Sequence, residues 1–588
     1  TFSYNAIIGA LVASGSIDEC DRIFHSIPEP DQCSWNLMVS GFAQLEMFDR
    51  SLEYFVEMHR KHFELNEYSY GSALSASAGL RNAIMGTQIH ASLSKSRCLL
   101  DVYMGSALVD MYAKCGEVIS AKNVFDSMEE RNTVSWNSMI TCYEQNGPPS
   151  EALQVFVVMM DCNVEPDEMT LASVISACAS LSAVKEGRII HALVMKSERL
   201  HSDVVISNAL VDMYSKCNMI AAARYIFDSM PFRNVVSETS MVSGYAKADS
   251  ISTARTLFSK MMERNVVSWN ALIAGYTQNG ENEEAVGLFL LLKRESVFPT
   301  HYTFGNLLNA CANMPDLKLG KQAHTHVLKH GCRFRQGPES DIFVGNALID
   351  MYMKCGSVED GAAVFGHMVE RDDVSYNAMI VGYAQNGRAA KALALFDEMS
   401  KTGRKPDHIT MIGVLSACSH AGLVEEGRKH FDSMTKSHGL TPLKDHYTCM
   451  VDLLGRAGLL DEAKRTILSM PVAADSVVWG SLLAACRVHG NVELGNFAAG
   501  EVFRRDPGNS GAYVVLCNMY AEGGRWRDAV RIRRVMKMKG ISKQPGCSWI
   551  EIEGELHVFM AKDRSHSRRW DIYLALRRLL KAMKLVGF

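Results

Sequence analysis

One asparagine recurs at the same place in three near-copies of a sixteen-residue segment. The copies read NTVSWNSMITCYEQNG from Asn132, NVVSWNALIAGYTQNG from Asn265 and DDVSYNAMIVGYAQNG from Asp372. The shared residue is Asn137, Asn270 or Asn377. An asparagine amide carries two N–H donors and a carbonyl acceptor, so it can recognise a polar partner by hydrogen bonding. Three copies of one such group suggest repeated recognition rather than three active sites.

The segment belongs to a longer internal repeat. Alignment on the S-W-N phrase and its looser relatives divides the first 475 residues into fourteen contiguous units of 31 to 41 residues. The units start at Thr1, Gln32, Glu67, Val102, Thr133, Glu168, Val204, Val235, Val266, His301, Ile342, Asp373, His408 and Asp445. An array without linkers indicates one repeating structure rather than a string of domains.

Each unit is predicted to form two helices. In the Val266 unit, the first helix covers roughly Ser268 to Thr277, QNGEN makes the turn, and the second helix carries an apolar stripe at i, i+3, i+4 and i+7. The stripe is Ala285, Leu288, Phe289 and Leu292, with counterparts at Ala152, Val155, Phe156 and Met159 and at Ala392, Leu395, Phe396 and Met399. One hairpin cannot bury such a stripe, but stacked neighbours can. We therefore predict an all-α fold, a right-handed α-solenoid superhelix with a long concave face, in which extra residues around 331–341 form a loop insertion.

Composition and charge narrow the function classes. The 588 residues are 47% hydrophobic, with no apolar run long enough to span a bilayer, and the formal net charge of −4 does not by itself indicate a nucleic-acid binder. Residues 476–588 carry a net charge of +9, whereas the first 475 residues carry −13, so the two parts are expected to meet different partners. The chain begins at Thr1 inside a repeat, so the lack of a targeting peptide says nothing about location.

The sixteen cysteines do not form metal-binding patterns. No C-x-x-C is present, and Cys115, Cys217 and Cys355 each end an M-Y-x-K-C phrase. We interpret them as small buried residues in a reducing compartment rather than as zinc ligands or disulfides, and we expect no metal or cofactor.

The repeat resembles a known family. Hairpins of about 35 residues with V-x-[WY]-N and P-D phrases are similar to pentatricopeptide repeats, and the alternation of three unit types resembles the plant P-L-S subclass of organellar RNA-editing factors. Segments from Ser476 and Gly511 resemble the two E motifs of that subclass, which defines a region at 476–543. Residues 544–588 resemble its E+ region, where Ile550, Ile552, Leu556 and Val558 alternate around Gly554 and predict a β-hairpin.

The resemblance implies no catalysis by this chain. In relatives with the complete pattern a DYW cytidine-deaminase-like domain follows, and we expect the chain to stop at Phe588, about where that domain would begin. Zinc deaminases need H-x-E and P-C-x-x-C. His62–Glu64 matches only the first half, inside a predicted second helix. The deaminase is therefore expected to act in trans, docked through the E and E+ regions.

The resemblance also assigns an RNA-reading role to two positions in each unit, the fifth and the last, at one base per repeat. It implies that Asn at the fifth position selects a pyrimidine and Ser or Thr a purine. An ionised Asp at the last position only accepts hydrogen bonds and suits uracil or guanine, whereas Asn can also donate and suits cytosine or adenine. The pairs are Asn5 with Asp31, Asn36 with Asn66, Ser106 with Asn132, Asn137 with Asp167, Asn208 with Asn234, Thr239 with Asn265, Asn270 with Thr300, Asn346 with Asp372, and Asn377 with Asp407. The last residues could instead only cap helices and close turns.

Two further positions complete the predicted interface. Apolar or aromatic second residues could stack on bases: Phe2, Tyr68, Tyr103, Val134, Val205, Val236, Val267, Phe343 and Val374. Lysines at the thirteenth position of 31-residue units could hold phosphates: Lys114, Lys216, Lys247 and Lys354.

The units at Glu67, Glu168 and His301 have small fifth residues, Gly71, Ala172 and Gly305, that offer no side-chain hydrogen bond to a base. The resemblance implies that such L-type units contact small accessory editing proteins. We expect a factor that binds single-stranded organellar RNA, and neither DNA nor membrane, at a site of C-to-U editing, in the mitochondrion rather than the plastid. The alternatives are a protein-binding helical-repeat scaffold and a factor for RNA stability, splicing or processing.

Overall fold

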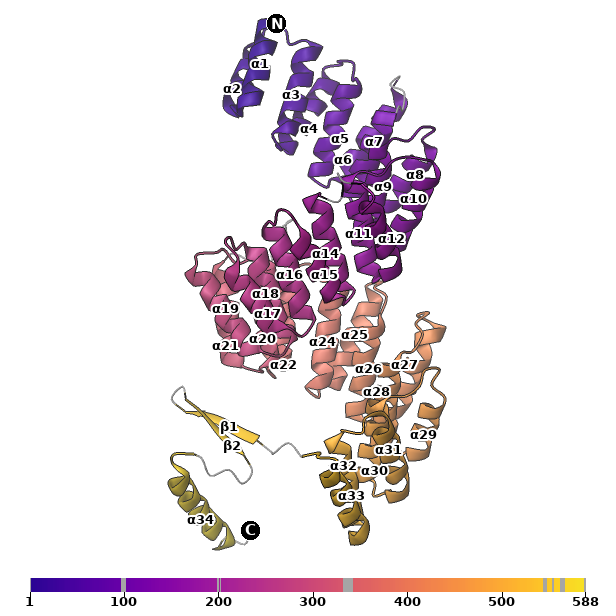
Figure 1. Ribbon diagram of the computed structural model, residues 1–588, viewed down its shortest axis with the longest axis vertical. Helices are drawn as coiled ribbons and strands as arrows, with labels where there is room; N and C mark the ends of the chain where they lie inside the picture. The colour runs from indigo at the N-terminus through magenta and orange to yellow at the C-terminus, as the bar shows by residue number, and fades with distance from the viewer. Residues whose placement is uncertain are drawn as a thin grey trace. The chain divides into compact units, whose positions relative to one another are not determined.

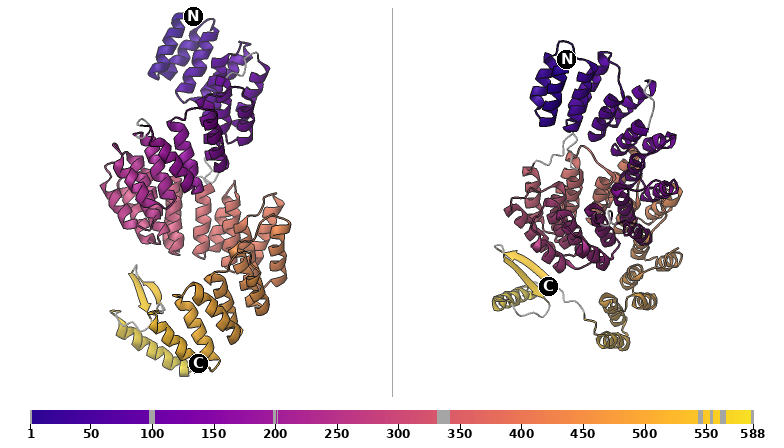
Figure 2. Two further views of the ribbon diagram at one scale, coloured as in Figure 1. Left: turned by 45° about the vertical axis from the view of Figure 1, so that its right-hand side comes forward. Right: turned by 45° about the horizontal axis from the view of Figure 1, so that its top comes forward.

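The computed structural model describes residues 2–96, 102–197, 200, 202–330, 342–542, 547–552, 555–560 and 566–585. The chain divides into two compact units, Thr1–Ala310 and Cys311–Phe588, with the division inside α20 (His301–Asn313). Within each unit, antiparallel helical hairpins stack side by side (Figures 1 and 2). The predicted all-α solenoid of hairpins is confirmed. The predicted loop insertion at 331–341 lies outside the described residues.

In the N-terminal compact unit, as far as α12, each odd-numbered helix is the first helix of a hairpin and each even-numbered helix is the second. The helices are α1 (Phe2–Ser14), α2 (Ile17–Ser26), α3 (Gln32–Gln44), α4 (Phe48–Arg60), α5 (Glu67–Gly79), α6 (Ala83–Lys95), α7 (Val102–Lys114), α8 (Val118–Ser127), α9 (Thr133–Asn146), α10 (Pro149–Asp161), α11 (Glu168–Leu181), α12 (Val184–Val194), α14 (Val204–Lys216), α15 (Ile220–Ser229), α16 (Val235–Lys247), α17 (Ile251–Lys260), α18 (Val266–Gln278) and α19 (Asn282–Arg294). The first helices α3, α5, α7, α9, α11, α14, α16 and α18 pack on one another in series.

The C-terminal unit continues the same arrangement. Its helices are α21 (Leu317–Lys329), α22 (Ile342–Lys354), α23 (Val358–His367), α24 (Asp373–Gln385), α25 (Ala389–Lys401), α26 (His408–Ala421), α27 (Val424–Lys436), α28 (Lys444–Arg456), α29 (Leu460–Leu468), α30 (Ser476–Val488), α31 (Val492–Arg505), α32 (Ser510–Glu522), α33 (Trp526–Met538) and α34 (Arg569–Leu585). First helices α22, α24, α26, α28 and α30 again pack in series.

The unit boundaries predicted from the sequence agree closely with the helices. Every predicted unit start from Gln32 to His408 is the first residue of a helix. The start predicted at Asp445 is wrong by one residue, because Leu443 takes the N-cap position and α28 begins at Lys444. The fifth residue of that unit is therefore Thr448 rather than Cys449. The expectation that His62 lies inside the second helix of its unit is also wrong. His62 lies after α4, in a turn where its φ is +61°.

The aromatic residue of the S-W-N phrase joins each unit to the one before it. Trp35, Trp136 and Trp269 are buried, each with its ring edge-on to a phenylalanine of the preceding second helix at centroid distances of 4.7 to 4.9 Å. An arginine that precedes the first helix covers the same phenylalanine in some joints. Arg264, for example, lies 5.2 Å from the Phe258 ring centroid and donates to the Phe258 carbonyl. Such aromatic contacts contribute beyond the apolar area that they bury.

The asparagine of the Q-N-G phrase has a structural role between units. The Nδ2 atoms of Asn146, Asn279 and Asn386 donate to main-chain carbonyls of the preceding first helix at 2.8 to 2.9 Å. The next residue closes the turn, and Gly280 adopts a φ of +80° that glycine accepts without strain. Part of the similarity among the copies of the sixteen-residue segment is therefore explained by these hydrogen bonds between neighbouring first helices.

A histidine–tyrosine pair recurs where an L-type unit meets the following unit. The Nδ1 atoms of His90 and His324 lie 2.9 and 2.8 Å from the hydroxyls of Tyr112 and Tyr352. Burial lowers the pKa of both histidines, since the charged ring loses hydration. Neutral imidazoles are therefore part of the folded state.

The C-terminal extension contains the predicted hairpin. Strands β1 (Cys547–Ile552) and β2 (Glu555–Met560) pair antiparallel, with Ile550 opposite His557 and Ile552 opposite Glu555. The intervening Gly554 lies outside the described residues. None of the helices within the described residues has the length and apolarity needed to cross a membrane.

The histidine pairs predict a pH dependence of stability. A lowered folded-state pKa means that the unfolded chain binds protons first, so the free energy of unfolding is full above about pH 6.5 and falls as pH drops below it. Urea unfolding midpoints measured from pH 7.5 to 5.0 should decrease toward acid. The His324→Gln variant should show a shallower decrease, and an unchanged slope would contradict this role.

Candidate functional site

The structure brings the predicted fifth and last residues together. Asn346 Nδ2 donates to Asp372 at 3.0 Å, Asn377 Nδ2 to Asp407 at 2.9 Å, and Asn270 Nδ2 to the Thr300 hydroxyl at 3.1 Å. The same contact joins Asn5 to Asp31, Asn137 to Asp167, Asn208 to Asn234 and, through its hydroxyl, Ser106 to Asn132, over 2.9 to 3.4 Å. Each pair closes the joint between one unit and the next, because the last residue precedes the next first helix.

Two predicted pairs are not hydrogen-bonded to each other among the described residues. The Asn36 Oδ1 atom is buried without a hydrogen-bond partner, although Asn66 lies at the next cap. The Thr239 hydroxyl donates instead to the Val235 carbonyl at 2.6 Å. In these two units the fifth and last residues both lie at the joint, but no hydrogen bond joins their side chains.

The last residue of the unit also caps a helix. Asp31, Asp167, Asp372 and Asp407 are N-cap residues whose carboxylates accept from the main-chain N–H three residues on. The alternative of helix capping is therefore a second role for the same side chains. Burial alone would raise the pKa of Asp372, but hydrogen bonds from Asn346 and Ser375 hold it below its ordinary value. Asp372 is thus an ionised acceptor at neutral pH.

A third side chain at these joints was not found by sequence reasoning. The third residue of the following unit is a fully buried Ser or Thr whose main-chain N–H or hydroxyl meets the pair: Ser34, Ser69, Ser135, Thr170, Ser237, Ser268, Thr303, Ser375 and Thr410. The signal was present in the sequence, as the serine of V-S-W-N. It was overlooked because serine near a helix start is also a common cap-box residue.

The second residues lie in the open beside the pairs. Val134, Val267 and Val374 are 57 to 58% exposed, and Phe2, Tyr68, Tyr103, Val205, Val236 and Phe343 are exposed as well. Second and fifth residues are three apart on a helix and therefore neighbour each other on its surface. Each such joint offers an accessible apolar group next to a polar pair.

The predicted phosphate lysines are mostly neutralised. Lys114, Lys216 and Lys354 each form a 2.8 Å ion pair with the aspartate four residues earlier, namely Asp110, Asp212 and Asp350. At Lys247 the corresponding residue is Ser243. The row of lysines is on the same helices as the pairs, but it is not a strip of uncompensated positive charge.

The L-type units are built differently at the same position. A Cβ atom on Gly71 would lie 3.3 Å from the Tyr103 ring of the next unit, so glycine leaves room for that contact. The third residues that follow are apolar and buried: Met104, Ile206 and Val344. No polar pair can form at these joints.

Outside the joints, the described residues contain neither a candidate metal site nor a thiolate at Cys178 or Cys418. No group of three or more His, Cys, Asp or Glu side chains there could hold a metal ion. The described cysteines are free, and burial raises the pKa of Cys178 and Cys418 to about 11, so neither is a thiolate at neutral pH. Cys115, Cys217 and Cys355, predicted to be buried, are only partly buried.

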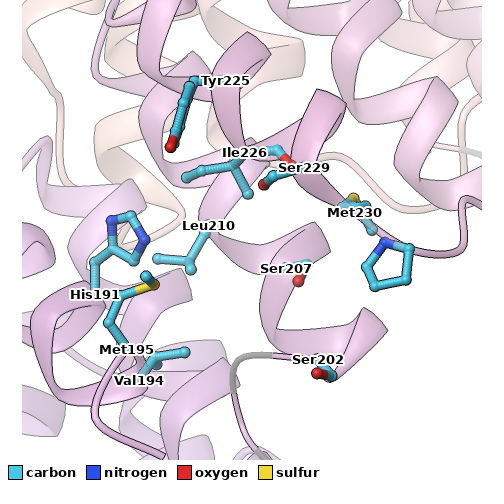
Figure 3. Close-up of a pocket in the computed structure, with 11 residues that line it drawn as sticks. His191, Val194, Met195, Ser202, Ser207, Leu210, Tyr225, Ile226, Ser229 and Met230 are labelled. Carbon is cyan, nitrogen blue, oxygen red and sulfur yellow. The ribbon is translucent and has the colours of Figure 1, made fainter. Parts of the chain in front are cut away.

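One cavity of about 210 Å³ lies among α12, α14 and α15, where Leu210, Ile226 and Met230 give it a mostly apolar lining (Figure 3). Its polar side chains are one histidine, one tyrosine and several serines, without a carboxylate. It is a small packing gap rather than a substrate site.

Comparison with known proteins gives the family. Models of the PPR repeat family match residues 131–180, 264–313 and 371–420, the PPR repeat model matches eight further segments from residue 2 to residue 472, and the E motif model matches residues 489–551. A pentatricopeptide repeat-containing protein of Arabidopsis thaliana is 61% identical over 99% of this chain and 88% of its own length. The chain belongs to the pentatricopeptide repeat family. Its matched segments are repeats and an E motif, so the matched part of the chain is a repeat scaffold.

Further pentatricopeptide repeat relatives in Arabidopsis thaliana carry different location names. One named mitochondrial is 40% identical over 98% of this chain and 71% of its own length, and one named chloroplastic is 35% identical over 99% and 63%. Among solved structures, the pentatricopeptide repeat protein PPR10 in complex with an 18-nt psaJ RNA element is 18% identical, with a TM-score of 0.49 over 92% of this chain and 85% of that chain.

Because the last residue both caps a helix and pairs with the fifth residue, substitutions of Asp407 should change the free energy of unfolding. Asp407→Ala should lower the free energy of unfolding by about 0.5–2 kcal/mol, because the N-cap acceptor of α26 is lost. Asp407→Asn should change it little, since asparagine caps as well as aspartate does. Chemical denaturation of the two variants measures the difference. Equal losses would show that the carboxylate charge, rather than its cap geometry, stabilises the joint.

Proposed function

We propose that this pentatricopeptide repeat protein binds single-stranded RNA in a sequence-specific manner, one base per unit. The observation that carries the proposal is the polar pair at the joint, partly accessible and flanked by an exposed apolar second residue. A base has an apolar face and a polar edge, so it fits an apolar group beside hydrogen-bonding groups. The repeat family is known for this mode of reading.

The pairs give a predicted RNA site. Asn/Asp pairs select U at the Thr1, Thr133, Ile342 and Asp373 units, Asn/Asn pairs select C or less strictly U, and Ser/Asn or Thr/Asn pairs select A. With N for L-type units, the site is 5′-U-Y-N-A-U-N-C-A-Y-N-U-U-3′. The thirteenth unit, with Ile412, leaves its base unspecified, whereas the corrected fourteenth unit pairs Thr448 with the N-cap Asp475 and favours a purine.

The bound RNA is proposed to be an organellar transcript at a site of C-to-U editing, a few nucleotides 5′ of the edited base. The match of residues 489–551 to the E motif supports this class, and the basic C-terminal part, 476–588, is the proposed dock for a DYW-type deaminase in trans. The L-type units are the proposed contact for small accessory editing proteins. Relatives named mitochondrial and chloroplastic support an organelle, with the mitochondrion as our proposal.

A protein-binding scaffold is the second candidate function. RNA binding and peptide binding make different demands on the residues at the joints. Binding a peptide gives no reason for the fifth residue and the last residue to vary as a coupled pair. The acidic repeats, with a net charge of −13 over residues 1–475, are what favours the scaffold.

Asp407→Asn tests the reading directly. The change replaces an obligate acceptor with a group that can donate, at nearly constant size, and should move the preference at the twelfth position from U toward C. Each correct base is expected to be worth about 1–3 kcal/mol over the wrong one. Binding of synthetic RNAs that differ only at position 12 measures the shift.

The eleventh position serves as the internal control, because its pair, Asn346 and Asp372, is untouched. Its preference for U should stay unchanged in Asp407→Asn. A uniform loss of affinity for all RNAs would show that Asp407 only holds the turn.

Deletion of residues 545–588 tests the proposed docking of a deaminase. The shortened protein should bind the RNA site nearly as well as the full chain but should no longer support editing in organelle extracts. The full chain alone should convert no cytidine. A collapse of RNA affinity on deletion would place the segment in the RNA interface, and chelator-sensitive deamination by the purified chain would overturn the assignment.

A further inference from the structure

We infer that the third-residue hydroxyl of a unit is a positioning group for the fifth asparagine of the preceding unit where that preceding unit ends in Asp or Thr, and that it helps to separate U from C. The inference rests on the proposed RNA reading and deepens it. It concerns buried Ser and Thr side chains that do not themselves reach the surface.

The hydroxyl follows one rule where the last residue is Asp or Thr. In those joints its nearest acceptor is the Oδ1 atom of the fifth asparagine, and the carboxylate of a last-residue Asp lies farther away, at 2.8 to 2.9 Å. Ser34 donates to Asn5, Thr170 to Asn137, Thr303 to Asn270, Ser375 to Asn346 and Thr410 to Asn377, over 2.5 to 2.7 Å.

The hydroxyl points elsewhere where the last residue is Asn. Ser69, Ser135 and Ser268 donate to the main-chain carbonyls of Asn66, Asn132 and Asn265 at 2.8 Å, and Ser237 donates to Asn234 Oδ1 at 3.0 Å. As a consequence, the Oδ1 atoms of Asn36 and Asn208 are buried without a hydrogen-bond partner.

Hydrogen-bonding capacity explains the division at the joints that end in Asp. A carboxylate can only accept, so it fixes the Nδ2 end of the fifth amide, which turns Oδ1 toward the hydroxyl. When Oδ1 accepts from the hydroxyl and one Nδ2–H donates to the carboxylate, the second Nδ2–H remains available as a donor. This donor suits a carbonyl oxygen of uracil. At an Asn/Asn joint no hydroxyl holds the buried Oδ1, so the amide is not fixed in one orientation. If the amide turns, it presents Oδ1 as an acceptor, which suits the N4 amino group of cytosine. A buried acceptor without a partner is costly, so a base that donates to it is favoured.

The L-type joints support the same assignment independently. Where the fifth residue is Gly71, Ala172 or Gly305, the third residue that follows has no hydroxyl. Those third residues are Met104, Ile206 and Val344, each fully buried. From the Thr1 unit to the Asp373 unit, the hydroxyl is present where the fifth side chain is polar and absent where it is not, whereas Thr448 of the last unit is followed by Val478.

Two serine variants separate this role from capping. Ser375 and Ser237 are both fully buried and both complete a capping box, at α24 and α16, but only Ser375 reaches a fifth asparagine. Ser375→Ala should reduce the U-over-C preference at position 11 by about fivefold, the effect of one hydrogen bond. Ser237→Ala should leave the preference at position 7 unchanged, with a similar loss of thermal stability. Ser375→Thr should keep the preference for U.

The measurement is the binding of synthetic 12-nucleotide RNAs of the predicted sequence, with U or C at position 11 or 7, to the full chain. If wild type distinguishes U from C at position 11 and Ser375→Ala retains that ratio, the hydroxyl only caps and the inference is wrong. If wild type does not distinguish them, the proposed reading itself fails. Should Ser375→Ala not fold, Thr410→Val against Thr410→Ser at position 12 decides the question by the same criterion.

Discussion

A helical hairpin of 31 to 41 residues exposes an apolar stripe that it cannot bury by itself, so each unit depends on its neighbours. The interactions that matter therefore span about one repeat along the chain. Trp269 packs on Phe258 of the preceding helix, and Asn279 holds the carbonyl of Ala246. The joint between units, rather than the unit, is where this fold is stabilised.

The same joint carries the candidate recognition groups, and the two demands are compatible. Asparagine inside a helix is unfavourable because its amide competes with the main chain. Here Asn377 is held between Asp407 and Thr410, so the amide is satisfied by its partners across the joint. A polar group that is already oriented loses little conformational freedom when it binds, which favours affinity and discrimination together.

The sequence was sufficient to predict the parts of this arrangement that repeat. Periodicity located the helix starts, and the coupled fifth and last positions identified residues that the structure places in contact. It was insufficient where a partner is close in space but unremarkable in sequence. Lys216 was expected to hold a phosphate, but Asp212 lies one helical turn away and pairs with it. The α28 start was missed because Leu443, an unusual cap residue, replaced the Asp, Asn or Thr of other joints.

The ion pairs along the first helices have a consequence for how RNA is bound on the proposed reading. Affinity that comes from free lysines is indifferent to sequence and declines steeply with salt. A lysine next to an aspartate presents little net positive charge to a phosphate, because the carboxylate repels the phosphate as the ammonium attracts it, so its contribution is small. Binding must then depend on base contacts and stacking at the joints. A protein with acidic repeats would hold unrelated RNA weakly, and the difference between its target and all other sequences would be correspondingly large.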